Sequence, residues 1–258
     1  MPVCGDGEVN GDEECDGGEN CTPRCTWEAR EPARASGEDP ARTSYTVNGV
    51  TFYTRRVPAV EGRGRPFEVM ETEVTQALYE AVMGNNPSHF RGAERPVEMV
   101  SWNDGIQFAN RLSRALSLSP VYQGEDNNAT MRQGATGFRF LSEAEWEWAA
   151  RCGENYEYAG SNNLDAVAWH GRNSGSQTHP VGQKQANACG LRDMSGNVFE
   201  WVADDYSNPG QYRPGAARRV GRGGSWRSGA DYCRVSYRDG SSPGYRDFLG
   251  LRFSRSLD

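Results

Sequence analysis

Seven cysteines carry the most distinctive chemistry of this 258-residue chain, and four of them lie close together near its start. They are separated by 10, 5 and 3 residues, without the paired C-x2-C spacing typical of zinc sites and without an intervening histidine. The residues around them are mostly Gly, Asp, Glu and Asn, which cannot bury a hydrophobic core. Disulfide bonds therefore fit better than a metal, and they imply an oxidising compartment. The four residues, whose pairing has three possibilities, are Cys4, Cys15, Cys21 and Cys25.

Charge is spread unevenly over the chain, whose formal net charge is −7. Residues 1–25 carry seven acidic side chains against one arginine, a net of −6, so the remainder is close to neutral at −1. From residue 210 to residue 258, ten arginines stand against four aspartates, a net of +6. These arginines alternate with Asp, Ser and Gly and do not form the basic stripe of a nucleic-acid-binding surface. We therefore expect no nucleic-acid partner.

No apolar run approaches the length of about 18 residues that a membrane-spanning helix needs, so we expect no transmembrane segment. The first residues also lack the charged, apolar and small-residue regions of a secretory signal. We expect a signal or lipid anchor, if the protein has one, to precede Met1.

The chain divides by composition into three parts. Residues 1–25 form the cysteine-rich module, and residues 26–44 are polar and contain Pro and Gly, as linkers do. Residues 45–258 are predicted to form one globular unit. It opens with alternating apolar and polar residues over 45–69, a pattern typical of strands.

Three short helices are predicted in the first half of this unit. Thr75 is a suitable N-cap for a helix that ends at Gly84. A second helix follows Ser101, with apolar residues at three- and four-residue spacing. A capping box from Ser142 to Glu145 begins the third. Beyond Cys152 the composition favours loops, with short strands near residues 198–202 and 249–253, so we predict an α+β fold that is low in regular structure.

The cysteine-rich module resembles a short cysteine-rich repeat that is named after myxobacteria and found in exported proteins. The matching residues are CGDG at 4–7, ECDG at 14–17, Cys21 and Cys25. The larger unit resembles the formylglycine-generating enzyme, or sulfatase-modifying factor, family. The sequence motifs on which this resemblance rests are FRFLSEAEWE (138–147), THPVG (178–182), DMSGNVFEW (193–201), RGGSW (222–226) and LGLR (249–252). The resemblance implies a C-type-lectin-like fold of the formylglycine-generating enzyme type, preceded by a small disulfide-stapled N-terminal module. Of the remaining cysteines, Cys152 lies at a predicted helix end and Cys189 in the loop before Gly190, and we predict that these two pair.

The enzymes of this family oxidise a substrate cysteine to formylglycine, with copper(I) held by two cysteines five residues apart. The resemblance puts these two positions at Ser228 and Cys233, so one thiolate is replaced by a hydroxyl. A hydroxyl is a hard ligand and suits copper(I) poorly. If the chain is nevertheless an oxygen-dependent oxidase that acts on a sulfatase-like substrate, the resemblance makes Cys233, Ser225 and Ser228 its catalytic residues, with copper as cofactor.

A structural calcium ion is a second implication of the resemblance. The turn from Asp193 to Glu200 offers two carboxylates and main-chain carbonyls, which are the hard oxygen ligands that calcium prefers. The predicted ligands are Asp193, Gly196, Val198 and Glu200.

The segment 226–248 is rich in Tyr, Arg, Ser, Gly and Asp, as antibody paratopes are. It resembles the C-terminal segment of variable proteins that retroelements diversify, which use this fold to bind ligands. We predict that it binds an unidentified protein or glycan, through Arg227, Asp231, Tyr232, Tyr237, Asp239, Tyr245, Asp247 and Phe248.

The sequence thus favours an exported, non-catalytic ligand-binding protein at the surface or in the envelope of a bacterium. A cysteine-modifying oxidase and a structural module of the cell envelope are the alternatives. The oligomeric state is left open.

Overall fold

The computed structural model describes residues 41–59 and 65–257. The chain separates into two units, Met1–Pro40 and Ala41–Asp258, and the described residues all belong to the second. The cysteine-rich module, its four cysteines and most of the predicted linker lie outside the described residues. The first strand begins at Arg42, three residues before the position at which the sequence pattern started the globular unit.

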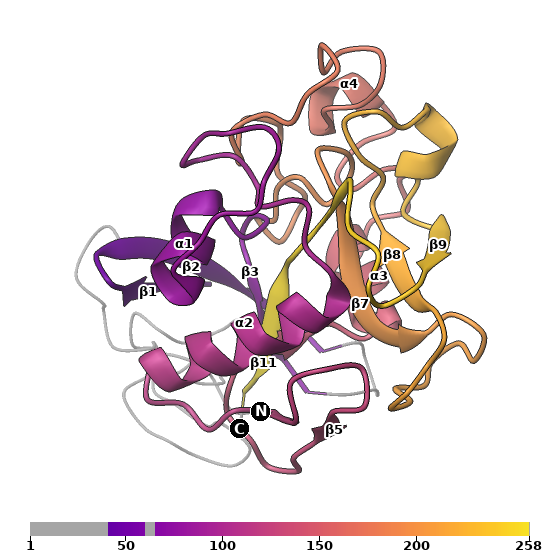
Figure 1. Cartoon of the computed structure of the whole chain (residues 1–258). Coiled ribbons are helices and arrows are strands. Elements are labelled where there is room, and N and C mark those ends of the chain that lie inside the picture. Colours follow the sequence, from indigo (N-terminus) through magenta and orange to yellow (C-terminus); the bar gives the residue numbers. More distant parts are fainter. Residues whose placement is uncertain (1–40, 60–64, 258) are drawn as a thin grey trace, which may run out of the picture. The chain divides into compact units, whose positions relative to one another are not determined.

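A five-stranded antiparallel sheet forms one part of this unit, in the strand order β1-β2-β3-β11-β6 (Figure 1). Asn48 and Gly49 join its first two strands with positive φ angles of 48° and 82°, as tight hairpin turns require. The last strand of the chain lies between β3 and β6, so the sheet is complete only when the C-terminal segment has folded back. The strands are β1 (Arg42–Val47), β2 (Val50–Val57), β3 (Phe67–Met70), β6 (Arg139–Phe140) and β11 (Phe253–Ser256).

The three predicted helices are present, and their caps explain where they begin and end. Helix α1 starts after Thr75, whose hydroxyl accepts the N–H of Leu78, and ends at Gly84 with a left-handed φ of 82°. Ser101 and Ser142 each form a full capping box at the start of α2 and α3. The helices are α1 (Gln76–Met83), α2 (Trp102–Ala115), α3 (Glu143–Arg151) and the single turn α4 (Leu164–Val167).

Packed aromatic rings join α2 to the first sheet. The Trp102 and Phe140 rings lie 5.2 Å apart, and Phe140 lies 5.0 Å from Phe253. All three side chains are fully buried. Burying an aromatic side chain contributes roughly 1.5–3 kcal/mol, so this cluster is a main source of stability for the unit.

A second sheet, in the strand order β10-β7-β8-β9, positions the loops that matter for function (Figure 1). Its edge strand β10 pairs with β7 in parallel, and the other pairs are antiparallel. Residues 223–237 connect β8 to β9, and residues 242–248 connect β9 to β10. The strands are β7 (Phe199–Asp205), β8 (Arg219–Arg222), β9 (Arg238–Ser241) and β10 (Leu249–Gly250); a separate hairpin is made by β4 (Tyr122–Gln123) and β5 (Thr130–Met131).

The predicted disulfide between Cys152 and Cys189 is confirmed. Cys152 is the C-cap of α3 and has a left-handed φ of 45°, which turns the chain away from the helix axis. The bond ties this helix end to a loop 37 residues further along the chain. Within the described residues, no helix is long and apolar enough to cross a membrane. The predicted α+β fold with little regular structure is also confirmed.

Candidate functional site

The predicted ligand segment lies on the two loops that flank β9 and on β9 itself. A short 3-10 helix, Ala230–Cys233, shapes the first of these loops. Its preceding turn includes Gly224, with a φ of 78°, where a Cβ atom would come within 2.7 Å of the Cys233 sulfur. Glycine is therefore required at this position, both for the backbone angle and for the space.

Cys233 is a buried neutral thiol. Its side chain is fully buried, and this burial raises its pKa to about 12. Close to it in sequence, the Ser225 N–H donates a 2.9 Å hydrogen bond to the Ser228 hydroxyl, and the two hydroxyls lie 3.1 Å apart. Copper(I) requires soft thiolate ligands, and this arrangement supplies one protonated thiol and two hydroxyls. The residues present do not fit a copper(I) dithiolate.

The first hollow on this face, which we name the Tyr232 pocket, has a volume of about 210 Å³. It contains the positions that the family resemblance assigned to catalysis, Ser225 and Ser228, together with residues predicted to bind a ligand. Its lining residues are Phe199, Ser225, Arg227, Ser228, Gly229, Tyr232, Asp239 and Phe248.

A second hollow, which we name the Trp226 pocket, has a volume of about 350 Å³. Half of its wall comes from the loop between α1 and α2, which the sequence did not associate with the ligand segment. The rings of Phe90 and Trp226 form a T-shaped pair at a centroid distance of 5.2 Å, which joins the two parts of the wall. The lining residues are His89, Phe90, Glu98, Met99, Trp226, Arg227, Asp247 and Phe248.

Arg227 and Phe248 line both pockets. The guanidinium carbon of Arg227 lies 3.9 Å from the centroid of the Phe248 ring, and its Nη2 atom lies 3.2 Å from Asp247 Oδ2. The side chains of Arg227 and Asp247 are each 46% exposed. The boundary between the two pockets is thus a half-exposed cation held by a ring and a carboxylate.

The remaining predicted ligand residues divide into exposed and packed ones. Tyr232 and Tyr245 are 49% and 38% exposed. Asp231 is exposed and pairs with Arg234. Tyr237 instead packs against the rings of Tyr232 and Phe199, at 4.9 Å and 6.4 Å, and serves partly as core.

The loop between α1 and α2 contributes Phe90 and Glu98, which sequence reasoning missed. Met99 has a left-handed φ of 61°, as does Asp247, and the Met99 N–H donates a 3.0 Å hydrogen bond to the Asp247 carbonyl. Left-handed backbone is unusual at residues other than glycine and persists only where the surroundings hold it. In the sequence, a residue such as Met99 carries no sign of this conformation.

The four predicted calcium ligands lie on one buried turn, but their donor atoms are not all available. Glu200 accepts a 2.8 Å hydrogen bond from Arg252 Nε on one oxygen and a 2.6 Å bond from Trp146 Nε1 on the other. Asp193 accepts the Gly182 N–H on one oxygen, and its other oxygen is buried without a partner among the described residues. In the described part of the chain, no three His, Cys, Asp or Glu side chains are grouped to hold a metal ion.

These contacts do not fit a calcium donor set, because the Arg252 guanidinium already neutralises Glu200. The carboxylate of Glu73 adds to the buried negative charge and accepts hydrogen bonds from Asn197 Nδ2 and the Val198 N–H. Burial, together with the nearby carboxylates of Asp193 and Glu200, raises the pKa of Glu73 well above its ordinary value. Burial also raises the pKa of Asp193 to about 6. The calcium site stays a prediction, and Arg252 forms the ion pair with Glu200 in this cluster.

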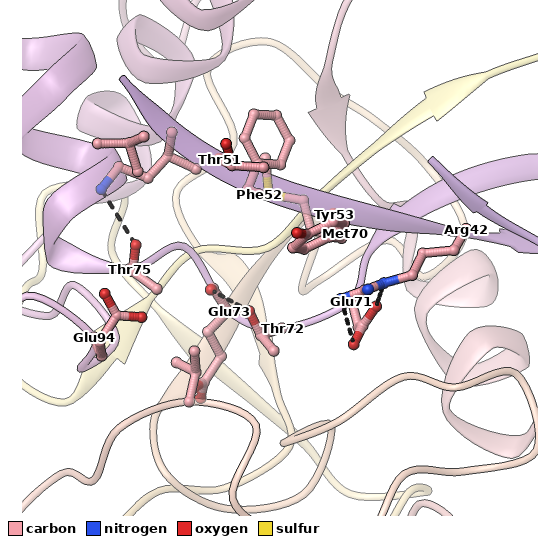
Figure 2. Close-up of a pocket in the computed structure, with 13 residues that line it drawn as sticks. Arg42, Thr51, Phe52, Tyr53, Met70, Glu71, Thr72, Glu73, Thr75 and Glu94 are labelled. Atoms are coloured by element: carbon pink, nitrogen blue, oxygen red, sulfur yellow. Dashed lines mark hydrogen bonds and ion pairs between the residues drawn. The ribbon is translucent and has the colours of Figure 1, made fainter. Parts of the chain in front are cut away.

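A third hollow of about 290 Å³ lies beside β2 and β3, and no predicted ligand residue lines it. In Figure 2, Arg42 and Glu71 lie toward one end of it, and Thr75 and Glu94 lie toward the other. Glu71 accepts hydrogen bonds from Arg42 and Arg55 at 2.7 and 2.9 Å, so its charge is already balanced. Glu94 is exposed.

Comparison with known proteins places this geometry in a family. The model of the sulfatase-modifying factor enzyme 1-like domain matches residues 32–257. The chaperone protein LppX of Paenibacillus barcinonensis is 39% identical over 220 residues, covering 72% of this chain and 76% of that protein. The formylglycine-generating enzyme of Streptomyces coelicolor is 35% identical over 168 residues, and the match spans about half of each protein, 54% of this chain and 53% of the enzyme.

A solved structure shows the same relationship. Treponema denticola variable protein 1 superposes with a TM-score of 0.77 and 36% identity, over 84% of this chain and 99% of that one. The family model and the first of the relatives each cover most of the chain. The chain belongs to the sulfatase-modifying factor enzyme 1-like domain family.

Proposed function

We propose that this chain is a non-catalytic ligand-binding domain of an exported bacterial protein, with residues 226–248 as its ligand face. The observation that carries the proposal is the pair of pockets on this face. The Tyr232 pocket is lined by Ser228, one of the two positions that the family resemblance assigns to a copper-binding cysteine, together with Tyr232 and Arg227. Exposed tyrosines and half-exposed arginines are the residue types that dominate protein-binding surfaces.

Three further findings support the proposal. The thiol of Cys233 is buried and neutral, whereas catalysis at a cysteine requires an accessible thiolate. The Cys152–Cys189 disulfide suits a protein that works outside the cytoplasm. The similarity to a Treponema denticola variable protein supports the proposal that the side chains of the 226–248 face vary between copies of this gene.

A displayed library of random peptides, selected on the full chain, tests the binding function. We expect peptides that bind the wild-type protein and compete with one another for one face. Their affinity should fall at least tenfold when Tyr232 is changed to Ser, because an exposed aromatic anchor contributes about 2 kcal/mol or more at such a surface. Peptides whose affinity is unaffected by changes in residues 226–248 would contradict the proposal and favour a structural envelope module.

Sequencing this gene from many cells of one population tests the variable character of the face. Substitutions should concentrate at residues that line the two pockets, such as Arg227, Tyr232 and Phe248. They should be absent from Cys233, which is fully buried and lines neither pocket. An even spread of substitutions along the gene would argue against diversification.

An oxidase is the second candidate, because Cys233 is retained and the family includes formylglycine-generating enzymes. The test is incubation with copper(I), oxygen and a Cys-x-Pro-x-Arg peptide, followed by mass spectrometry of the peptide. We expect no aldehyde from the wild-type protein beside an active two-cysteine enzyme. Conversion that is abolished in Cys233→Ala would establish the oxidase instead.

A further inference from the structure

The Trp226 pocket combines aromatic rings with two carboxylates, one of which lacks a cationic partner. Glu98 is only 3% exposed, yet it lines the pocket and accepts the Phe90 N–H at 2.8 Å. Within the described residues, no Lys, Arg or His side chain forms an ion pair with it. A buried carboxylate without a counter-charge is costly, so a cation that entered the pocket would gain a strong partner.

The rings around Glu98 are suited to the same kind of ligand. Phe90, Trp226 and Phe248 present their rings to the hollow, and aromatic faces attract ammonium and guanidinium groups. Asp247 adds a second carboxylate at 46% exposure. Two carboxylates therefore face Arg227 and His89 in this wall, which carries a net negative charge while the His89 imidazole is neutral.

Arg227 shows how a cation sits in this wall. Its guanidinium stacks on Phe248 and pairs with Asp247, which are the contacts that a ligand cation would seek. The side chain is half exposed and carries no other ion pair within the described part of the chain, so it can turn out to solvent at small cost. The guanidinium of Arg227 thus occupies a surface that is suited to bind a cation.

We propose that the Trp226 pocket receives a Lys or Arg side chain of a protein partner, with Glu98 and Asp247 as its counter-charges and Arg227 as the group it displaces. This inference rests on the proposed function and names its ligand class. Neutral and acidic glycans lack the required cation, so the pocket favours a protein partner.

The test uses Nα-acetyl-lysine methylamide and, as the uncharged probe of similar shape, Nα-acetyl-norleucine methylamide. Each is titrated into the labelled full chain while the Met99 methyl and Trp226 indole N–H resonances are followed. The lysine probe should bind in about the millimolar range, as a single contact of this kind does, and at least tenfold more tightly than the norleucine probe. Equal affinity of the two probes would overturn the proposal.

Three variants locate the effect. Glu98→Gln keeps the shape of the side chain and should lower the affinity for the lysine probe about tenfold, since a charge-assisted hydrogen bond is lost. Arg227→Gln removes the competing cation and should raise this affinity several-fold. Glu94→Gln removes one charge from the hollow beside β2 and should change nothing, which controls for a general electrostatic effect.

If Glu98→Gln does not fold, Asp247→Asn is the second variant that tests the role of a carboxylate in this pocket. Asp247 is half exposed, and Asn tolerates the left-handed backbone that this position requires. It should also weaken the lysine probe. Unchanged binding in every folded variant of Glu98 and Asp247 would overturn the proposal.

The selected peptides separate this inference from the function on which it rests. Peptides that bind the face but lack enrichment in Lys and Arg would reject the cation pocket and leave the binding function intact. A lysine probe that binds as described, with no peptide selected, would count against the proposed function and leave the pocket in place.

Discussion

Arg227 lies over the ring of Phe248, with 3.9 Å between its guanidinium carbon and the ring centroid. This one contact separates the Trp226 pocket from the Tyr232 pocket, since both residues line both hollows. Cation–π contacts at exposed sites contribute about 0.5–1 kcal/mol, so a partner can break this one readily. A ligand that moves Arg227 would join the two pockets into a single groove.

Binding of the lysine probe should weaken as the pH falls. Burial raises the pKa of Glu98 above its ordinary value, so this carboxylate gains its proton earlier than an exposed glutamate. The protonated form carries no charge with which to attract an ammonium group. The measurement is the affinity of the lysine probe between about pH 4 and pH 8.

Three other charged groups face the same pocket: His89, Arg227 and Asp247. The Glu98→Gln variant therefore serves as the reference, because its remaining pH dependence belongs to those groups. A wild-type profile no steeper than that of Glu98→Gln would show that Glu98 does not contribute.

Cys233 should resist thiol reagents in the native protein. Its burial and its pKa of about 12 leave almost no thiolate at about pH 8, and the thiolate is the reactive form. Peptide mapping after labelling should find Cys233 modified only once the chain is denatured. Rapid labelling of Cys233 in the folded protein would revive the catalytic interpretation.

Breaking the Arg252–Glu200 pair should destabilise the domain strongly. Both side chains are at most 1% exposed, and removing one partner of a buried ion pair costs about 3–5 kcal/mol. Urea unfolding of Arg252→Gln measures this loss.

Because the arginine already balances Glu200, we also expect addition of calcium or a chelator to leave the wild-type melting temperature unchanged.

A calcium-dependent rise in that temperature would contradict the second expectation. It would then support the calcium ligands inferred from the family resemblance. Asp193→Asn is the matched variant, because the rise should disappear when this predicted ligand loses its charge.

The Cys152–Cys189 disulfide should contribute about 3–4 kcal/mol to the free energy of unfolding. Its 37-residue loop sets this value, since the cross-link restricts the unfolded chain. Urea unfolding with and without a reductant measures the contribution. The effect of the reductant should be lost in the Cys152→Ala/Cys189→Ala variant, and a reductant effect that persists there would assign the stability to other cysteines.

Local patterns predicted the helices well, because capping chemistry depends on residues close in sequence. Thr75, Ser101 and Ser142 each begin a helix, as expected. The strands were predicted less accurately. The segment 249–253 divides into β10 and the start of β11, because Leu251 and Arg252 between them bond to Val74 and Glu200.

Part of the site could not be predicted from the sequence because it depends on tertiary contacts. Residues 226–248 could be singled out by composition and resemblance, but half of the Trp226 pocket comes from a loop more than a hundred residues earlier. No local pattern links Glu98 to Asp247. Likewise, the acidic turn at Asp193 is typical of calcium sites, and the arginine that balances Glu200 approaches from the far end of the chain.

The most direct test of the ligand face is the affinity of a selected peptide for three tyrosine variants. Tyr232→Ser changes a residue that is 49% exposed on the face, and Tyr156→Ser changes one that is 38% exposed and lines neither pocket. Tyr156→Ser should alter stability by no more than about 0.5 kcal/mol, as surface substitutions do. Tyr232→Ser should cost about 0.5–1.5 kcal/mol, because its ring also packs on Tyr237 at 4.9 Å. Tyr237→Ala, which removes a ring packed on Phe199, should reduce stability as well as binding.

We predict at least a tenfold loss of affinity in Tyr232→Ser and none in Tyr156→Ser, measured well below the melting temperature of each variant. Equal affinities in the two variants would contradict the assignment of residues 226–248 as the ligand face.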